Sequence, residues 1–174
     1  MISFKIFYTE AKQVGILYHY TGIFSLPRII FENKLGTEHV NYISFTRDKH
    51  FHKYDRHGII ADECRIVIDG DKLSNNYKIK PYNYFGDQSK EGIGPYLSRK
   101  PHHKIFDEQE ERVNKSITDI KQYIIKIQLF KKILDHIFST AMTRKFDTGN
   151  GFIYFNSSEK FLDYLRQHCP VELI

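Results

Sequence analysis

Short runs of β-branched and aromatic residues, separated by turn-forming residues, are the dominant pattern along the chain. Runs of this length, bounded by Gly, Asn, Asp and Ser, are typical of β-strands. They predict strands over residues 2–8, 15–20, 42–46, 64–69, 77–80, 121–129 and 151–155. Between two of these strands, the sequence DGDKLS is interpreted as a turn, since it gathers Asp, Gly and Ser in one place.

Helical spacing of apolar residues appears in segments that alternate with these strands. A first helix is expected to begin at Ser25 as N-cap, with Pro27 in its first turn, and to end near 35–36. Apolar residues at intervals of three and four predict an amphipathic helix over 130–138, which would cover one face of a sheet.

The end of the chain predicts one more helix. Asn156 followed by Glu159 resembles a capping box and predicts a closing helix over 157–168. Residues 86–107 are rich in glycine, proline and charge without periodicity, and are predicted to be a long surface loop. There are no internal repeats and no linkers, so we expect an α+β fold with a single compact domain over 1–174.

The amino-acid composition indicates which kind of partner the protein binds and in which cellular compartment it works. The net charge is +5, and the chain has 12 Tyr and 14 Phe but no Trp. A basic, aromatic surface suits a polyanion such as a nucleic acid or a nucleotide. Cys64 and Cys169 are far apart and have no metal-ligand spacing, which favours a reducing, cytoplasmic location. We expect no signal peptide, and no apolar run approaches the roughly 20 residues that cross a bilayer.

His19 and Thr21 stand two positions apart at the end of a predicted strand, directly before the first helix. Residues at this spacing share one face of a strand, whereas Tyr20 points to the other. A ring nitrogen and a hydroxyl can bond ribose hydroxyls or a carboxamide, and a helix N-terminus favours phosphate. The alternative is an ordinary strand whose polar side faces water.

The same stretch carries a family resemblance. His19-x-Thr21, followed by Ser25-Leu26-Pro27 and Ile29, resembles the opening of the DarT-type DNA ADP-ribosyltransferases. RNA 2'-phosphotransferases and poly-ADP-ribose polymerases open similarly, although Tyr20 stands where they have glycine. The resemblance implies an ADP-ribosyltransferase-like split β-sheet core with flanking helices, and NAD as substrate. It assigns NAD binding to His19, Tyr20 and Thr21, which would hold the ribose and the nicotinamide amide.

A second element that the resemblance demands is a strand with hydroxyl residues beside the nicotinamide. The sequence ISFTRD at 43–48 fits, with Ser44 and Thr46 on one strand face, and both are expected in the NAD site. Arg47 leaves the strand at a turn, where its guanidinium can bond a pyrophosphate bidentately or orient the acceptor. For the two hydroxyl residues, ordinary strand polarity is an equal alternative.

The third element is a glutamate near the start of a late strand, preceded two residues earlier by Gln or Glu. The sequence FDEQEERV supplies Gln109-x-Glu111 and Glu108-x-Glu110. A carboxylate beside the ribose can stabilise the positive charge that develops when nicotinamide leaves, bond the 2'-hydroxyl and deprotonate the acceptor. Glu111 is the expected catalytic residue and Glu110 the reserve. The alternative is a solvated acidic surface.

Two further patterns compete with this interpretation. Histidines and aspartates that could hold the metal of a nuclease occur at His50, His52, His57, His102, His103, Asp48, Asp55 and Asp62. Their spacings match no zinc signature. The run DKHFHKYDRHG interleaves cations with aromatics, as surfaces for single-stranded nucleic acid do, and a solvated loop would look the same.

The residues and the resemblance together predict a mono-ADP-ribosyltransferase that moves ADP-ribose from NAD to a macromolecular acceptor. The resemblance implies a nucleic-acid base as acceptor, a role as toxin, phage or mobile-element effector, and an antitoxin protein as a further partner. A non-catalytic nucleic-acid or protein-binding module on the same fold is the alternative. An RNA 2'-phosphotransferase ranks lower, because no set of arginines for a 2'-phosphate can be placed, and so does a metal-dependent nuclease.

Overall fold

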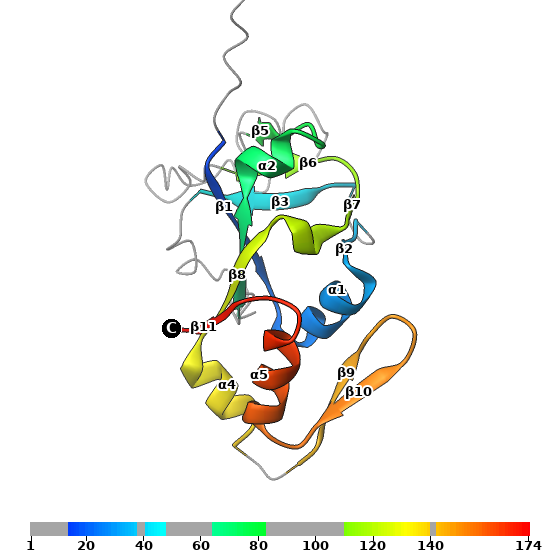
Figure 1. Ribbon diagram of the computed structural model, residues 1–174, viewed down its shortest axis with the longest axis vertical. Helices are drawn as coiled ribbons and strands as arrows, with labels where there is room; N and C mark the ends of the chain where they lie inside the picture. Colours follow the sequence, from blue (N-terminus) through cyan, green and yellow to red (C-terminus); the bar gives the residue numbers. More distant parts are fainter. Residues whose placement is uncertain (1–13, 38–40, 48–63, 83–109, 140–141) are drawn as a thin grey trace, which may run out of the picture.

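A mixed sheet of seven strands forms the centre of the molecule (Figure 1), and its strand order is β11-β8-β4-β1-β3-β6-β5. The computed structural model describes residues 14–37, 41–47, 64–82, 110–139 and 142–174. The strands of this sheet are β1 Ile16–Thr21, β3 Ile43–Thr46, β4 Cys64–Asp69, β5 Lys80–Tyr82, β6 Glu110–Val113, β8 Ile124–Leu129 and β11 Val171–Leu173. Only the β11–β8 pair is parallel within this sheet.

The remaining elements surround this sheet. Short strands β2 Lys34–Leu35 and β7 Ile117–Thr118 pair with each other, and β9 Arg144–Asp147 and β10 Phe152–Phe155 form a hairpin. The helices are α1 Leu26–Glu32, α2 Gly70–Ser74, α4 Lys131–Ile137 and α5 Ser158–Arg166, with 3₁₀ turns η1 Ile23–Ser25 and η4 Ile120–Gln122. Figure 1 shows β5, β6 and α2 at the upper end of the molecule, and α4 and α5 at the lower end. No described helix has the length and apolar character to cross a membrane.

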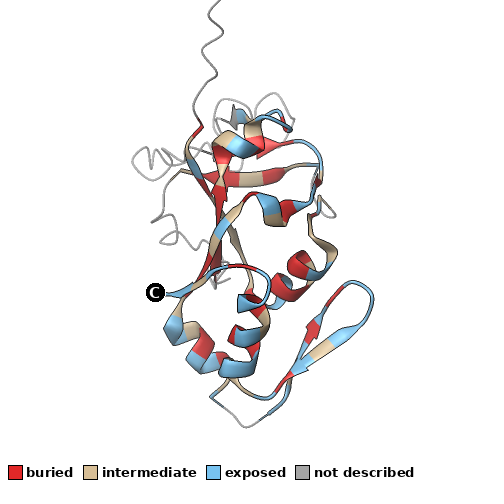
Figure 2. Ribbon diagram, in the orientation of Figure 1, coloured by how far each residue is buried: buried red, intermediate tan, exposed pale blue. Residues whose placement is uncertain are grey.

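One face of the sheet, which we call the inner face, is turned to the hydrophobic core. Alternate residues of β1, β4 and β8 form it, all fully buried: Leu17, Ile66, Ile68, Ile127 and Leu129. They belong to a single cluster with the apolar residues of α1 and α5. Figure 2 shows buried positions concentrated on β4 and α1. Because side chains alternate along a strand, every second residue of β1 and β3 lies on this face too.

The opposite face, which we call the outer face, carries a buried polar network. Arg65 is only 8% exposed. Its Nε donates to Gln128 Oε1, and its guanidinium lies 5.4 Å from the Tyr18 ring centroid. Gln128 Nε2 in turn donates to Glu172 at 2.6 Å. A buried cation is tolerated here because hydrogen bonds and a ring face replace its hydration.

The helix after β1 forms where the sequence predicts it, with Pro27 in its first turn. Ser25 occupies the N-cap position without a side-chain capping bond. The predicted end near 35–36 is wrong, because Asn33 adopts the left-handed conformation, with φ 51°, and terminates the helix after Glu32. Asparagine is one of the few residues that enters this conformation readily.

The segment predicted as a turn after β4 is helix α2 instead, so that prediction is wrong. Asp69 caps this helix by accepting the Lys72 backbone N–H at 2.9 Å. Asp71 Oδ1 accepts the Gly15 N–H at 2.9 Å, which ties the helix to the start of β1. Gly70 also donates to Gly15 O at 2.8 Å. This bond between distant segments could not be read from local turn chemistry.

At the C-terminal end, the predicted helices are present with shifted boundaries. The helix predicted over 130–138 is confirmed as α4. The prediction that Asn156 caps the last helix is wrong. Ser157 is the N-cap of α5, and its Oγ accepts the Lys160 N–H at 3.3 Å. The strand predicted over 2–8 and the loop predicted over 86–107 lie outside the described residues.

The other strand predictions are confirmed with adjusted limits, except the one over 77–80, which is largely wrong. The segments predicted at 15–20, 42–46 and 64–69 form β1, β3 and β4. The segment predicted over 121–129 begins as the turn η4 and becomes strand β8, and the one over 151–155 contains β10. The strand predicted over 77–80 overlaps β5 only at Lys80. The predicted α+β class, with a central sheet and flanking helices, is confirmed.

Candidate active site

His19 lies on the inner face of β1 beside Phe45 of β3, with 5.7 Å between the ring centroids. Its Nδ1 is 3.0 Å from the Ser44 carbonyl oxygen. A carbonyl only accepts, so Nδ1 carries the proton and donates. Burial lowers the pKa of His19, and the bond to Ser44 opposes this effect in part. In the neutral ring, Nε2 is therefore a hydrogen-bond acceptor.

Glu111 lies on the same face, one strand further along the sheet. Strand β6 pairs with β3, and this register sets Glu111 directly opposite Phe45. Because directly opposed residues share a face, His19, Phe45 and Glu111 form a row across β1, β3 and β6. Glu111 is only 5% exposed. A buried carboxylate requires a compensating charge or hydrogen-bond donors.

Arg47 supplies that charge. It follows β3 two residues after Phe45, which places it diagonally from Glu111 on the inner face. Its Nε and Nη2 lie 2.9 and 2.8 Å from the same carboxylate oxygen, Glu111 Oε1. Of the residues that the structure describes, none forms a hydrogen bond with Oε2. The Arg47 side chain is 31% exposed, so the pair lies at the edge of the buried region.

Thr21 ends β1 on the same face as His19, as the two-residue spacing predicts. It pairs with Cys64 of β4, and its carbonyl oxygen accepts the Cys64 thiol at 3.0 Å. This contact anchors the strand end through the backbone. The Thr21 side chain is partly exposed, next to the 3₁₀ turn that leads into α1.

Three of the predicted NAD-site residues lie on the outer face. Thr46 is opposite Tyr18 in the β1–β3 register, so Thr46 and Ser44 do share one face, but it is the face away from His19. Tyr20 also lies there, and its hydroxyl accepts from Arg65 Nη1 at 3.5 Å. Ser44 reaches His19 through its backbone carbonyl. The structure thus places His19, Arg47 and Glu111 on one face of the sheet, with Arg47 bonded to Glu111 and Phe45 between Glu111 and His19.

Phe45 is the site residue that the sequence interpretation missed. The signal was present, because alternation along ISFTR groups Phe45 with Arg47 as surely as it groups the two hydroxyl residues. Which group faces the histidine depends on the pairing of two strands, and this pairing is not visible in either strand alone.

Some candidate residues cannot be placed in this site. Glu110 is paired with Thr46 in the β3–β6 register, and its side chain lies outside the described part of the chain. The histidines and aspartates considered for a metal lie outside the described residues as well. Within the described ranges, no group of three His, Cys, Asp or Glu residues is arranged to hold a metal ion.

No protein-family model and no curated protein matches the sequence. Solved structures of DarT are similar to this chain in fold. DarT from Thermus sp. 2.9 in complex with ADP-ribosylated ssDNA is 11% identical, with a TM-score of 0.51 over 92% of this chain and 94% of that chain. The same protein in complex with carba-NAD+ is 12% identical, with a TM-score of 0.50 over 92% and 95%. At such identities the likeness shows the fold.

The chain therefore has the fold of DarT, and the resemblance predicted from the His19-x-Thr21 opening is confirmed at the level of the fold. Fold alone does not establish chemistry, which depends on the residues of the site.

Proposed function

We propose that this chain is a mono-ADP-ribosyltransferase that uses NAD as substrate and a nucleic-acid base as acceptor. The observation that carries the proposal is the buried Glu111 carboxylate, bonded by Arg47 and aligned with His19 on one face of a DarT fold. The similar structures are complexes with carba-NAD+ and with ADP-ribosylated ssDNA, which makes single-stranded DNA the acceptor to test first.

His19 is proposed to hold the NAD ribose. Its Nδ1–H is engaged by the Ser44 carbonyl, so Nε2 is left as an acceptor for a ribose hydroxyl. The neutral ring is the form that can accept, and burial favours that form by lowering the His19 pKa. Thr21, on the same strand face, is proposed to add a hydroxyl for the nicotinamide amide.

Glu111 is proposed as the catalytic carboxylate. In the reaction, the bond between the ribose carbon and nicotinamide breaks, its electron pair leaves with nicotinamide, and positive charge develops on the sugar. A fixed carboxylate stabilises such charge in a site of low dielectric constant. Oε2 is proposed to accept a hydrogen bond from the 2'-hydroxyl of the ribose. The same atom would then take the proton that the acceptor base loses when it bonds to the ribose carbon.

Arg47 is proposed to position Glu111. It fixes Oε1 with two donors and leaves the second oxygen for substrate. The partial exposure of its guanidinium also allows a contact with a phosphate of NAD or with the acceptor. Glu110 is the alternative candidate for the catalytic carboxylate.

The outer-face residues are proposed to contribute indirectly. Ser44 fixes the His19 tautomer through its carbonyl oxygen. Tyr20 bonds Arg65 and Thr46 is buried, so both are proposed to hold the strands that present the site.

The biological setting is also a proposal. We place the protein in the cytoplasm, where the buried thiols of Cys64 and Cys169 would stay reduced. A role as toxin, phage or mobile-element effector, with an antitoxin protein as partner, rests on the resemblance to DarT-type enzymes.

Incubation with NAD labelled in the adenylate phosphate tests the function directly. Single-stranded DNA, duplex DNA, RNA and cell protein would be offered as separate acceptors, with free nicotinamide measured in parallel. We expect covalent label on single-stranded DNA and an equal amount of released nicotinamide. Label on protein alone would overturn the proposed acceptor class, and no nicotinamide release with any acceptor would favour a binding module.

A further inference from the structure

A hollow of about 190 Å³ lies where β5 and β6 meet at the upper end of the molecule (Figure 1). We call it the lysine pocket. Its lining consists of Lys78, Lys80, Val113, Asn114 and Lys115. A water molecule occupies about 30 Å³ in the liquid, so the volume has room for a hydrated phosphate group. None of these residues belongs to the row of His19, Phe45 and Glu111.

The electrostatics of the lysine pocket select for an anion. The three lysines that line it are exposed, and no carboxylate is among the described residues of the lining. Within the described part of the chain, no ion pair joins them to an acidic side chain. The Lys115 ammonium lies 4.7 Å from the Tyr77 ring centroid, which holds it beside the hollow. Three positive charges around one hollow favour an anionic ligand over a neutral one.

A buried arginine, Arg112, lies beside the lysine pocket and is 7% exposed. Arg112 is directly opposite Lys80 in the β5–β6 register, so both side chains lie on the same face. The Arg112 guanidinium lies 3.6 Å from the Tyr42 ring centroid. This face is the outer one, because Arg112 also opposes Ser44.

The lysine pocket is distinct from the proposed NAD site but lies next to it. Lys80 faces the outer side of the sheet, whereas His19 and Glu111 lie on the inner side. Val113, which also lines the pocket, opposes Ile43 and therefore lies on the inner face, two residues from Glu111 on the same strand, which is about 7 Å. The pocket therefore lies at the end of β6, with lining residues from both faces of the sheet and close to the proposed catalytic carboxylate.

We propose that the lysine pocket binds the phosphodiester backbone of the single-stranded acceptor next to the base that is modified. This inference rests on the proposed function for the identity of the acceptor, although binding itself requires no NAD. An extended nucleic-acid strand whose base meets Glu111 on the inner face can continue along β6, past Val113, to the lysines. Cationic grooves beside the reacting site are how single-stranded nucleic acids are held without sequence preference.

The test measures binding of a labelled single-stranded oligonucleotide by fluorescence anisotropy, without NAD, over a range of salt concentrations. The variant is the triple substitution Lys78→Gln, Lys80→Gln and Lys115→Gln. Each lost phosphate contact lowers the slope of log affinity against log salt by about 0.7 for single strands. We therefore expect the slope to fall by about 2 and the affinity at 0.1 M salt to fall by up to roughly 100-fold.

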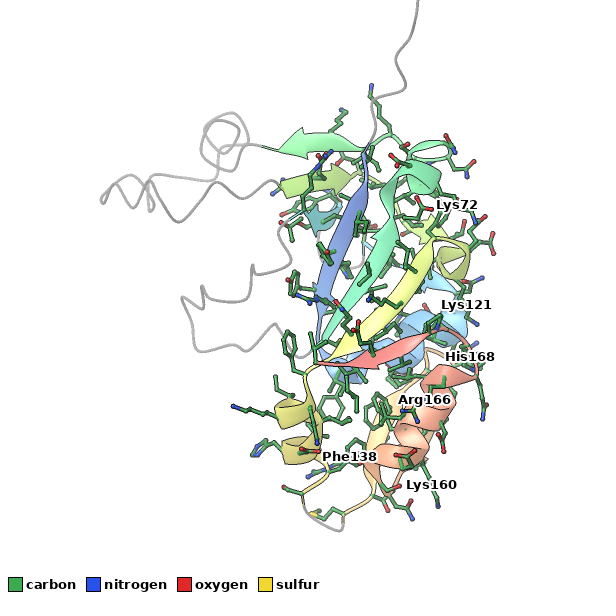
Figure 3. All side chains as sticks on the ribbon, turned by 60° about the vertical axis from the view of Figure 1, so that its left-hand side comes forward. Lys72, Lys121, Phe138, Lys160, Arg166 and His168 are labelled. Atoms are coloured by element: carbon green, nitrogen blue, oxygen red, sulfur yellow. The ribbon has the colours of Figure 1, made fainter. Side chains whose placement is uncertain are left out.

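A matched control removes the same charge from the opposite end of the molecule. Lys131→Gln, Lys132→Gln and Lys160→Gln change exposed lysines on α4 and α5, and Figure 3 shows Lys160 at the lower end, far from Lys72 of α2. The control should keep the wild-type slope to within the error of the titration. Replacing the three pocket lysines by arginine should also keep it, since the charge remains.

The outcomes separate this inference from the proposed function. Loss of oligonucleotide binding in the pocket variant, with nicotinamide release from NAD alone unchanged, supports the inference. Equal affinity losses in the pocket and control variants would overturn it, as would wild-type affinity in the pocket variant. If the pocket variant instead loses NAD binding and keeps the oligonucleotide, the phosphate held there is the pyrophosphate of NAD, and the inference is wrong. A wild-type protein that binds the strand but transfers nothing would contradict only the proposed function.

Discussion

Arg47 donates both Nε and Nη2 to one oxygen of Glu111, at 2.9 and 2.8 Å, across a sequence separation of 64 residues. The contact orients a carboxylate that is 5% exposed, and it leaves Oε2 without a donor from any described residue. An arginine is always protonated in proteins, so this carboxylate has a permanent counter-charge. The geometry is that of a carboxylate held in one orientation for a partner on its other side.

Replacing Arg47 by lysine should lower kcat more than it raises KM. The charge remains, but the planar pair of donors that fixes Oε1 is lost, so Glu111 can rotate away from the ribose. Misplacement of a catalytic group by about 1 Å costs roughly 100-fold in rate. Steady-state and single-turnover measurements of nicotinamide release would check this.

A double variant provides the control for this positioning role. If Arg47 acts through Glu111, adding Arg47→Lys to Glu111→Gln should cause little further loss, because residues that act as a unit are non-additive. A full additional loss in the double variant would mean that Arg47 acts on NAD or the acceptor independently of Glu111.

His19 makes folding stability depend on pH. Burial lowers its pKa from 6.5 in the folded chain, so the unfolded chain binds a proton at a pH where the folded chain does not. The stabilising contribution is fully present above pH 6.5 and is lost as pH falls from there through the lowered pKa. Urea unfolding between pH 5 and 8 would measure this loss of stability on the acid side.

The comparison for this measurement is His19→Asn. Asparagine keeps an N–H donor for the Ser44 carbonyl but does not titrate. Its free energy of unfolding should fall less steeply below pH 6.5 than that of the wild type. Parallel pH profiles for the two proteins would show that another group is responsible, and would remove the support for a neutral His19.

Gly70→Ala should destabilise the fold at the junction of β1 and α2. A Cβ at this position would lie 2.4 Å from the Gly15 carbonyl oxygen, which is backbone and cannot swing away. Overpacking of this kind costs about 1–3 kcal/mol. Gly151→Ala is the matched control, since nothing lies within 4 Å of its Cβ position. Equal midpoints of thermal unfolding for the two variants would contradict the packing described here.

Cys169 should react slowly with alkylating reagents. Burial raises the pKa of its thiol from 9.0 to about 11, so the reactive thiolate at pH 8 is roughly 100-fold scarcer than for an ordinary cysteine. In a Cys64→Ala variant, Cys169 is the only cysteine of the chain, and iodoacetamide labelling reports on it alone. Labelling in the native state at the rate seen in urea would contradict this.

The secondary-structure elements that carry the site follow from patterns within each segment of the sequence. The strand with His19, the helix after Pro27 and the strand with Arg47 follow from side-chain alternation and spacing. The chemistry of a carboxylate and a position before an apolar strand favour Glu111 in the sequence, and in the structure Glu111 lies beside Arg47. That residues 1–174 form one domain stays a prediction.

Features that depend on pairing between distant segments could not be read from the sequence. The β1–β3 register decides that Phe45, rather than Ser44 or Thr46, lies beside His19. The helix α2 replaces a turn because its capping bonds are joined by a tie to Gly15 at the start of β1. In both cases the local sequence allows two structures, and a contact from elsewhere in the chain selects one.

Glu111 is proposed as the catalytic carboxylate of ADP-ribose transfer. The most direct measurement compares wild-type and Glu111→Gln proteins for transfer of label from NAD to a single-stranded oligonucleotide, with NAD affinity measured by calorimetry on the same samples. We expect Glu111→Gln to lose transfer by at least about 10²-fold, with NAD affinity nearly unchanged. Wild-type transfer by Glu111→Gln, with the fold intact, would contradict it and direct attention to Glu110.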